Sequence, residues 1–363
     1  MKDILNVAKN FTLDGEIESI RAHGNGNVND TYLVTLAEGE GHAILQRVNT
    51  YVFSAPEVVM DNMHKATQHL SACVAQDGLD WQVQQVIPAV GGQAYWEERD
   101  GTFWRMISFI ENSESFDTVY THKQAYELGY ALGMFHQHIN RLPADTFRTV
   151  IEGFHVSPGY LKAFDQAKNS GAERLDDELD YALEFIEKHR QIIPLLEEAK
   201  SSGILPLRTI HGDPKANNVM FDKLSGKAIS MIDLDTIQPG LVHYDIGDCI
   251  RSSCNPLGEE PGVEWRETTF DVESFQHLLK GYLVWGKSFL SESEYDYIYE
   301  AIFLMAFELG LRFLTDYLRG DLYYKVHFPT QNKYRALTQF RLAGEIQKNR
   351  TKIIKIIKEL QPL

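Results

Sequence analysis

The segment formed by residues 211–235 constrains the fold of this chain more than any other part of its sequence. It places Asp213, then Asn218 five residues later, and then Asp233 at the end of an apolar run. Two short, largely apolar runs flank a turn-like stretch at residues 222–226, which predicts a β-hairpin. Because a hairpin brings its two ends together, we expect Asn218 and Asp233 to face one point in space, beside Asp213.

This layout is the one that phosphoryl transfer needs. One carboxylate orients and deprotonates an acceptor hydroxyl, while an amide oxygen and another carboxylate hold Mg²⁺ against nucleotide phosphates. The spacing therefore predicts Asp213 as the catalytic base and Asn218 and Asp233 as metal ligands. Fragments of the segment also fit other roles: an Asp-Pro pair can start a turn, an Asp-x-Asp motif binds metal in sugar-nucleotide enzymes, and His211 with Asp213 fits a metal hydrolase. Their order and spacing together favour phosphoryl transfer.

Four neighbouring residues are predicted to support this chemistry. His211 is expected to orient the catalytic loop through a hydrogen bond rather than to react. Lys215, two residues after the base, would neutralise charge on the moving phosphoryl group, although a solvated lysine fits the same pattern. Asp235 is interpreted as a second metal ligand or as the cap of the following turn. Residues 244–248 are interpreted as structural support, with Asp245 a possible helix cap.

Length and composition exclude several classes of protein. At 363 residues the chain is long enough for two lobes of unequal size. A formal net charge of −16 argues against nucleic acid as a partner, because no basic surplus is present to neutralise phosphates. The three cysteines have no metal-ligand spacing, and no apolar run approaches the ~18 residues of a membrane span. We therefore expect a cytoplasmic protein with no membrane partner, whose oligomeric state the sequence leaves open.

The first part of the chain predicts an antiparallel sheet with one helix. Residues 31–36 and 43–48 have the alternation of strands, and residues 55–70 have a helical pattern. Gly24 and Gly26 form a glycine-rich turn upstream of these elements, where glycine lets backbone N–H groups approach nucleotide phosphates closely. A plain hairpin has the same pattern, but the phosphoryl-transfer segment downstream favours the phosphate-covering role.

The rest of the chain is dominated by helical periodicity. Apolar side chains recur at three- and four-residue steps, as on one face of an amphipathic helix. The predicted helices cover residues 125–139, 175–198, 270–285 and 295–318. The last fifteen residues mix isoleucines with lysines, a pattern that fits a membrane-surface helix but in an acidic chain favours a helix packed on the body.

The chain resembles the aminoglycoside phosphotransferase and choline kinase group, which are relatives of the protein kinases. Residues 211–218 have that group's His-Gly-Asp-x-x-x-x-Asn pattern. Further matching stretches lie at residues 24–32, 44–49 and 312–323, so the resemblance covers most of the chain. The stretch 312–323 is most similar to the N-acetylhexosamine 1-kinases, which phosphorylate the anomeric hydroxyl of a sugar.

This resemblance implies a fold and a pair of cofactors. The fold would be α+β and bilobal, like that of the protein kinases. A small N-terminal antiparallel β-sheet lobe, residues 1–110, would bind the nucleotide, and a larger, mostly helical C-terminal lobe, residues 111–363, would carry catalysis and substrate binding. ATP would be the phosphoryl donor and Mg²⁺ the metal.

The resemblance also implies which residues meet the nucleotide. Phe109 and Ile110 belong to the inter-lobe linker, where backbone groups contact adenine, and the glycine-rich turn as far as Asn29 would cover the phosphates. Protein kinases grip the phosphates with a lysine on the third strand. Here Gln46 stands at that position, and Arg47 points to the opposite face of a regular strand. We therefore expect either Arg47, through a bulge, or Mg²⁺ and backbone N–H groups to hold the phosphates.

The acceptor site is predicted from a helix with an apolar middle. Glu308, Arg312 and Asp316 are spaced by four residues and so share one helix face, which fits a structural ion-pair ladder. An arginine on a mostly buried helix is costly unless paired, and such charges are enriched at functional sites. In the sugar kinases, the positions that match Arg312 and Tyr323 contact the hexosamine.

These observations predict an ATP- and Mg²⁺-dependent kinase whose acceptor is the anomeric hydroxyl of an N-acetylhexosamine. Two alternatives stay open. One is a kinase with the same fold that acts on choline, an amino alcohol or an aminoglycoside. The other is a non-catalytic nucleotide-binding protein, which the absent strand lysine supports and the intact Asp213, Asn218 and Asp233 set opposes.

Overall fold

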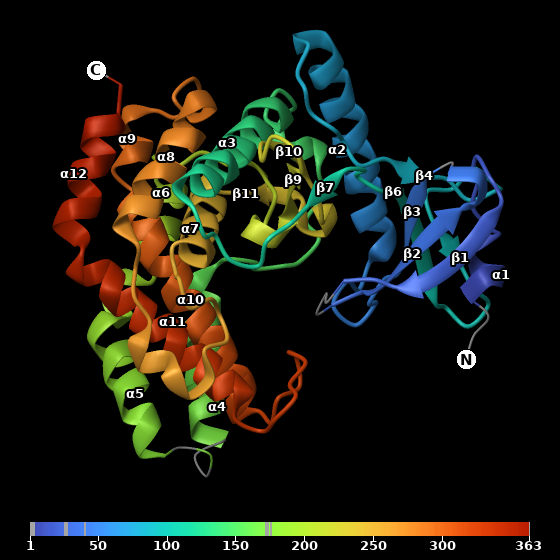
Figure 1. Cartoon of the computed structure of the whole chain (residues 1–363). Helices are drawn as coiled ribbons and strands as arrows, with labels where there is room; N and C mark the ends of the chain where they lie inside the picture. Colours follow the sequence, from blue (N-terminus) through green and yellow to red (C-terminus); the bar gives the residue numbers. More distant parts are fainter. Residues whose placement is uncertain (1–3, 25–27, 40, 171–173, 175, 363) are drawn as a thin grey trace.

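The structure, a computed structural model, describes residues 4–24, 28–39, 41–170, 174 and 176–362. It has two lobes: a sheet with one long helix, and a larger, mostly helical body (Figure 1). The α+β, bilobal, kinase-like fold predicted from the sequence is therefore confirmed. None of the helices formed by these residues is long and apolar enough to cross a membrane.

The N-terminal lobe is built on an antiparallel sheet. Its strand order among the described residues is β1-β2-β3-β6-β4, and β5 pairs with β6. The strands are β1 (Ile17–Ala22), β2 (Asp30–Leu36), β3 (His42–Arg47), β4 (Val86–Ile87), β5 (Trp96–Glu97) and β6 (Phe103–Ser108). β2, β3 and β6 pair in continuous register, so side chains that face each other across them share one face of the sheet.

The two faces of this sheet pack against different partners. Ile44 on β3 and Ile107 on β6 belong to a core that continues into the C-terminal lobe, whereas Leu45 belongs to a separate outer core closed by α1 (Ile4–Ala8). Because side chains alternate along a strand, Gln46 falls on the inner face and Arg47 on the outer face.

The long helix α2 (Pro56–Asp77) links the two lobes. It is longer than the predicted 55–70 helix and ends at Gly78, which has a left-handed backbone. The amide of Asn62 donates to the carbonyl groups of Arg148, at 2.7 Å, and of Ile237, at 2.9 Å, both in the C-terminal lobe. The N-terminal lobe also contains the short helix α1, whereas the sequence predicts only one helix there.

The C-terminal lobe is a helical body. The sequence missed α4, α7 and α11, and its predicted 175–198 helix is divided where Pro194 precedes the last helical segment. α7 is buried along almost its whole length, so it has no amphipathic stripe to detect. The helices are α3 (His122–Ile139), α4 (Ser157–Ser170), α5 (Asp177–His189), α6 (Leu195–Ser201), α7 (Val242–Ser253), α8 (Val272–Gly286), α9 (Glu292–Tyr295), α10 (Ile298–Leu318), α11 (Gln331–Lys348) and α12 (Arg350–Leu360). Ile353 and Ile357 of α12 are buried, as expected for a helix packed on the body.

Short strands at the junction of the lobes carry the catalytic segment. β9 (Val219–Asp222) and β10 (Ala228–Met231) form the predicted antiparallel hairpin. β7 (Ser113–Glu114) extends this hairpin, and β8 (Arg208–Ile210) pairs with β11 (Gln238–Gly240). The catalytic segment therefore begins at the end of one strand pair and continues into the other.

Candidate active site

The buried side chain of Asp245 holds the catalytic loop, residues 211–218, through hydrogen bonds. This carboxylate accepts the backbone N–H groups of His211, at 2.7 Å, and Gly212, at 2.9 Å, and His136 contacts it at 2.8 Å. Burial opposes ionisation, but the hydrogen bond from His136 and its neighbours keeps the pKa of Asp245 below its ordinary value. Asp245 lies inside α7 and not at its N-cap, so the interpretation of Asp245 as a helix cap was wrong.

His211 lies in an orienting position. Its Nε2 is 3.0 Å from the carbonyl oxygen of Ile232 and must donate to it, so Nδ1 is left to accept the backbone N–H of Asp213, at 3.3 Å. Burial lowers the pKa of His211, which agrees with a neutral ring. The ring thus connects the loop that carries the base to the loop that carries Asp233.

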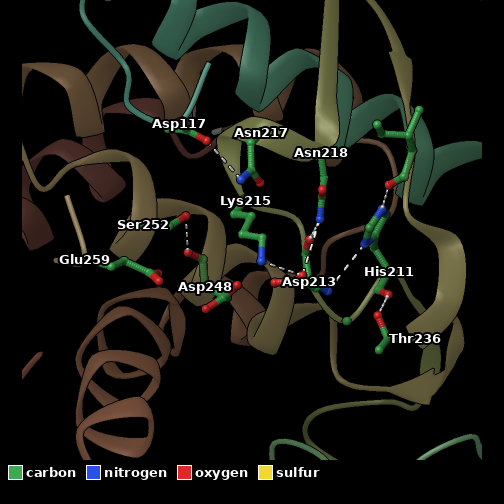
Figure 2. Close-up of polar contacts among 12 residues, drawn as sticks. Asp117, His211, Asp213, Lys215, Asn217, Asn218, Thr236, Asp248, Ser252 and Glu259 are labelled. Atoms are coloured by element: carbon green, nitrogen blue, oxygen red, sulfur yellow. Dashed lines mark hydrogen bonds and ion pairs between the residues drawn. The ribbon is translucent and has the colours of Figure 1, made fainter. Parts of the chain in front are cut away.

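Asp213 faces two polar side chains (Figure 2). Lys215 Nζ lies 2.9 Å from its Oδ2, and the Asn218 amide donates to its main-chain oxygen at 2.8 Å and to Oδ2 at 3.3 Å. Burial would raise the pKa of Asp213, but the Lys215 ammonium outweighs it and lowers that pKa. The carboxylate is therefore ionised and partly exposed, and it can accept a proton from a substrate hydroxyl.

The backbones of Asn218 and Asp233 lie side by side, as the predicted hairpin requires. The N–H of Ile232 donates to the carbonyl oxygen of Asn218 at 2.9 Å, which places Asp233 directly beside it. The amide nitrogen of Asn218 donates to Asp213, so the amide oxygen points away from Asp213. Burial, Asp235 and Asp213 raise the pKa of Asp233 to about 7, a state that a cation would relieve.

Asn218 and Asp233 offer an amide and a carboxylate oxygen, which are ligand types that magnesium binds in proteins. Mg²⁺ is usually held by one or two protein oxygens together with substrate phosphates and water. Asp233 has a left-handed backbone, with φ of 62°, a conformation that aspartate tolerates better than most residues and that is enriched at functional sites. Asn218 and Asp233 would hold the ion there.

Asp235 has a different role from the one predicted. Arg105 Nη1 lies 2.5 Å from its Oδ1, and the Asn29 amide donates to its Oδ2 at 2.8 Å. Both carboxylate oxygens thus bind side chains of the N-terminal lobe. This corrects the interpretation of Asp235 as a second metal ligand.

The structure differs from the expectation at Arg47. Its side chain is 50% exposed on the outer face of the sheet and pairs with Asp30, which corrects the expectation that it grips phosphates. Gly24 has a positive φ of 72° at the start of the glycine-rich turn, and Asn29 closes that turn against Asp235. Gly26 lies outside the described residues.

The predicted linker residues, Phe109 and Ile110, directly follow β6. The Phe109 ring lies 5.4 Å from the ring of His42 and 6.1 Å from that of His23, at the end of β1. Ile110 is buried, and its carbonyl oxygen accepts the hydroxyl of Ser113 at 2.6 Å. Their predicted contact with adenine stays a prediction.

Arg312 is surrounded by aromatic rings. Its guanidinium carbon lies 5.4 Å from the ring centre of Phe154, 5.3 Å from Tyr160 and 6.0 Å from Tyr324, and its side chain is 17% exposed. We call these four residues the acceptor wall, after the acceptor contact predicted for Arg312. Burial raises the pKa of Tyr160 to about 12, so its hydroxyl stays neutral and able to hydrogen-bond. Apart from Arg312, none of the four was found from the sequence, because they lie on separate segments.

The predicted ladder along α10 is only partly formed. Arg312 lies 3.9 Å from Glu308, whereas Asp316 accepts the backbone N–H groups of residues 322, 323 and 324, at 2.8–2.9 Å. Asp316 therefore folds the loop after α10 back toward Arg312. Tyr323 lies on this loop beside Tyr324, and it is 46% exposed.

A buried histidine that the sequence gave no reason to select connects the acceptor wall with the catalytic loop. Nε2 of His155 contacts the carbonyl oxygen of Gly212 at 2.9 Å, and Nδ1 lies 3.0 Å from Glu308. Burial opposes protonation, but the Glu308 carboxylate outweighs it and raises the pKa of His155. Three contacts thus lead from Arg312 through Glu308 and His155 to the residue before Asp213.

Two further carboxylates lie on the Lys215 side of Asp213 (Figure 2). Asp248 is 2.9 Å from Nε of Arg251, and Glu259 is 2.7 Å from its Nη1. Burial raises the pKa of Asp248. Because one arginine pairs with both groups, this side of the site is less acidic than its composition indicates.

The family of the chain follows from a match over most of this architecture. Residues 19–278 match the phosphotransferase enzyme family. The match covers more than half of the chain, which therefore belongs to the phosphotransferase enzyme family.

Solved structures with the same fold include three kinases. An aminoglycoside phosphotransferase from Alicyclobacillus acidocaldarius superposes with a TM-score of 0.63 at 15% identity, covering 97% of this chain and 95% of that one. A choline kinase from Cryptosporidium parvum gives 0.62 at 14%, covering 99% and 97%. A microcompartment-associated aminopropanol kinase gives 0.59 at 16%, covering 97% and 98%. The predicted superfamily is confirmed; at these identities the likeness to each structure concerns the fold.

Proposed function

We propose that this phosphotransferase transfers the γ-phosphoryl group of ATP, with Mg²⁺, to the anomeric hydroxyl of an N-acetylhexosamine, either N-acetylglucosamine or N-acetylgalactosamine. The product would be the sugar 1-phosphate. The use of ATP implies a cytoplasmic enzyme. A spectinomycin phosphotransferase of the same fold has been solved with ADP, which supports a nucleotide in the equivalent cleft.

The base that the reaction needs is supported by the geometry at Asp213. As the anomeric oxygen bonds to the γ-phosphorus and the bond to the ADP oxygen breaks, Asp213 would orient the hydroxyl and accept its proton. An anomeric hydroxyl is more acidic than an ordinary alcohol, so a carboxylate of lowered pKa can serve as its base. Lys215, 2.9 Å from Asp213, would offset the negative charge of the moving group. Bound Mg²⁺ would neutralise the phosphates.

The nature of the acceptor is supported by one observation: the buried guanidinium of Arg312 lies within three contacts of the catalytic loop. A fixed positive charge disfavours a cationic acceptor such as choline or an aminoglycoside. The ring of Tyr160 and a guanidinium donor suit the flat face and the oxygens of a neutral sugar. Asp248 and Glu259, which could attract an amine, are both paired with Arg251.

The test is ADP release from ATP and Mg²⁺ over a panel of acceptors. We expect turnover with N-acetylglucosamine or N-acetylgalactosamine, and a product phosphorylated at the anomeric carbon by ³¹P and ¹³C NMR. The matched control is the methyl glycoside of the same sugar, whose anomeric oxygen is blocked and which should not react. Phosphorylation of the methyl glycoside would place the transfer at another hydroxyl.

The same panel separates the alternatives. Turnover of choline, aminopropanol or an aminoglycoside without turnover of N-acetylhexosamines would refute the sugar assignment and keep the phosphotransferase. Binding of ATP without transfer to any acceptor would favour a non-catalytic nucleotide-binding protein.

A further inference from the structure

The N-terminal lobe holds the loop that carries Asp233 through a buried ion pair. Arg105, on β6, places Nη1 2.5 Å from Oδ1 of Asp235, and the two side chains are 1% and 4% exposed. Charged groups are buried to this degree almost only when they are paired. Asp235 lies two residues after the candidate metal ligand, in the short helix η6 (Leu234–Thr236). The pair therefore connects the sheet of one lobe with the metal-binding loop of the other.

A second side chain of the N-terminal lobe binds the same carboxylate. The amide of Asn29 donates to Oδ2 of Asp235 at 2.8 Å, and its Oδ1 accepts the backbone N–H of Asn49 at 3.0 Å. Asn29 thus ties the end of the glycine-rich turn both to the chain after β3 and to η6. The carboxylate of Asp235 is held at both oxygens.

Arg105 is itself fixed by the sheet. Its Nε donates to the side-chain oxygen of Gln46 at 2.8 Å, and the Gln46 amide donates to Thr31 at 3.0 Å. Gln46 and Arg105 are paired across β3 and β6 and share the inner face. Position 46, where protein kinases have a lysine, is uncharged here. The inner face of the sheet instead has a cation at position 105 of the neighbouring strand.

On its other side, the same short loop is bonded to the catalytic loop. The hydroxyl of Thr236 donates to the carbonyl oxygen of His211 at 2.7 Å. A Cβ atom at Gly212 would come within 2.8 Å of Thr236, so only glycine, with φ of 87°, permits this approach. Residues 233–236 therefore lie between the N-terminal sheet and the catalytic loop, bonded to both.

We propose that Arg105, Asp235 and Asn29 form an inter-lobe latch that sets the position of Asp233 and the separation of the two lobes at the candidate metal site. They are positioning residues: Asp235 acts through the backbone of Asp233, and Arg105 and Asn29 act through Asp235. The proposal rests on the proposed function only in taking Asp233 as the magnesium ligand.

The latch predicts a specific pattern of energetic coupling. Removing one charge of a buried pair leaves the other without a partner, which is more damaging than removing both. Asp235→Asn and Arg105→Met should each increase amide exchange in η6. The double variant should show no larger increase than the more strongly affected single variant. Two independent defects would instead add.

Amide hydrogen exchange of the protein without metal or nucleotide tests the latch directly. In Asp235→Asn, we expect the amides of residues 234–237 and of Asn49 to exchange about tenfold faster or more. The matched control is Arg47→Met with Asp30→Asn, which removes an exposed ion pair from the outer face of the same sheet and should leave these rates unchanged.

Steady-state kinetics supplies the second readout. Each single variant should raise the Mg²⁺ concentration for half-maximal activity and lower kcat, by roughly tenfold, with the acceptor KM within twofold of wild type. Arg105→Lys, which keeps the charge, should recover part of the loss. Because the exchange arm needs no acceptor, it remains informative if the proposed function fails.

Two outcomes would overturn the latch. One is unchanged amide exchange in residues 234–237 of Asp235→Asn. The other is strictly additive loss in the double variant, which would show that Arg105 and Asp235 act separately. The neutral double variant contains no unpaired buried charge, so it provides a folded comparison even where a single variant is unstable.

Discussion

The catalytic loop and the acceptor wall are neighbours in the C-terminal lobe, but they are constructed differently. The catalytic loop is one continuous segment whose backbone is held by hydrogen bonds to buried groups, among them Asp245 and Thr236. The acceptor wall gathers side chains from the segment before α4, from α4, from α10 and from the loop after α10, around one guanidinium. Under the proposed function, fixed backbone geometry would set the reaction, and side chains that can vary independently would set the choice of acceptor.

This contrast predicts that changes in the catalytic loop affect turnover with any acceptor, whereas changes in the acceptor wall affect one acceptor more than another. It would be broken by an acceptor-wall variant that lowers kcat equally for every substrate. The following four variants test it, in order of decreasing effect.

Asp213→Asn should have the largest effect. Replacing the base removes proton transfer and orientation of the hydroxyl, so we expect kcat to fall by about 10³-fold or more, with nucleotide affinity within a few-fold of wild type. ADP release and calorimetric binding of ATP measure the two quantities. Asp222→Asn, at the end of β9 in the same hairpin, is the control and should keep full activity. Retention of a tenth of the activity would remove Asp213 as the base.

Asp245→Asn should follow. Its carboxylate accepts two backbone N–H groups of the catalytic loop while fully buried, and an amide can face only one of them with an acceptor. We expect the free energy of unfolding to fall by about 3 kcal/mol and kcat by about 10²-fold, measured by urea unfolding and ADP release.

A matched control for Asp245 is Asp271→Asn. Asp271 also accepts two backbone N–H groups, at the N-terminus of α8, where asparagine is a good replacement. Equal loss of stability in both variants would mean that Asp245 has no special part in holding the catalytic loop.

Arg312→Met keeps the length of the side chain and removes its charge. We expect the acceptor KM to rise by roughly tenfold, with the ATP KM within twofold. The accompanying control is Arg319→Met, at an exposed arginine just after α10. An unchanged acceptor KM would exclude Arg312 from the acceptor site and would remove the main support for a neutral sugar.

His155→Asn should have the smallest effect on activity, about two- to threefold in kcat. Asparagine tolerates the left-handed backbone of this position, φ 61°, but it cannot carry the charge that pairs with Glu308. Asp248 and Arg312 also act on this ring, with opposite sign.

The pH dependence of stability provides the sharper test of His155. Its pKa is raised in the folded protein, so its contribution to stability is complete below the ordinary histidine pKa of 6.5 and is lost as pH rises through the folded pKa. The stability advantage of wild type over His155→Asn should therefore shrink as the pH rises above 6.5 in urea unfolding. The exposed His64→Asn is the control. A constant difference across this range would show that His155 is not a charged partner of Glu308.

Sequence reasoning succeeded where the geometry is local. The hairpin from Asn218 to Asp233 follows from two apolar runs and a turn, and the meeting of its ends follows from the pairing of its strands. It failed where the answer depends on which face a side chain takes or what lies opposite. Arg47 and Arg105 are both arginines on strands, and only the sheet register and the outer core show that Arg47 faces the solvent and Arg105 faces Asp235 of the C-terminal lobe.

By itself, the spacing within one segment of the sequence determined the phosphotransferase chemistry and the order of the candidate base and metal ligands, whereas the two-lobed fold followed from the resemblance to a known family. Only the tertiary structure decided that Asp235 pairs with Arg105, that Asp245 holds the catalytic loop and that His155 reaches it from the acceptor side. These contacts join residues 33 to 153 positions apart. A buried polar group takes whichever partner packing brings within about 3 Å, and no local pattern of residues records that partner.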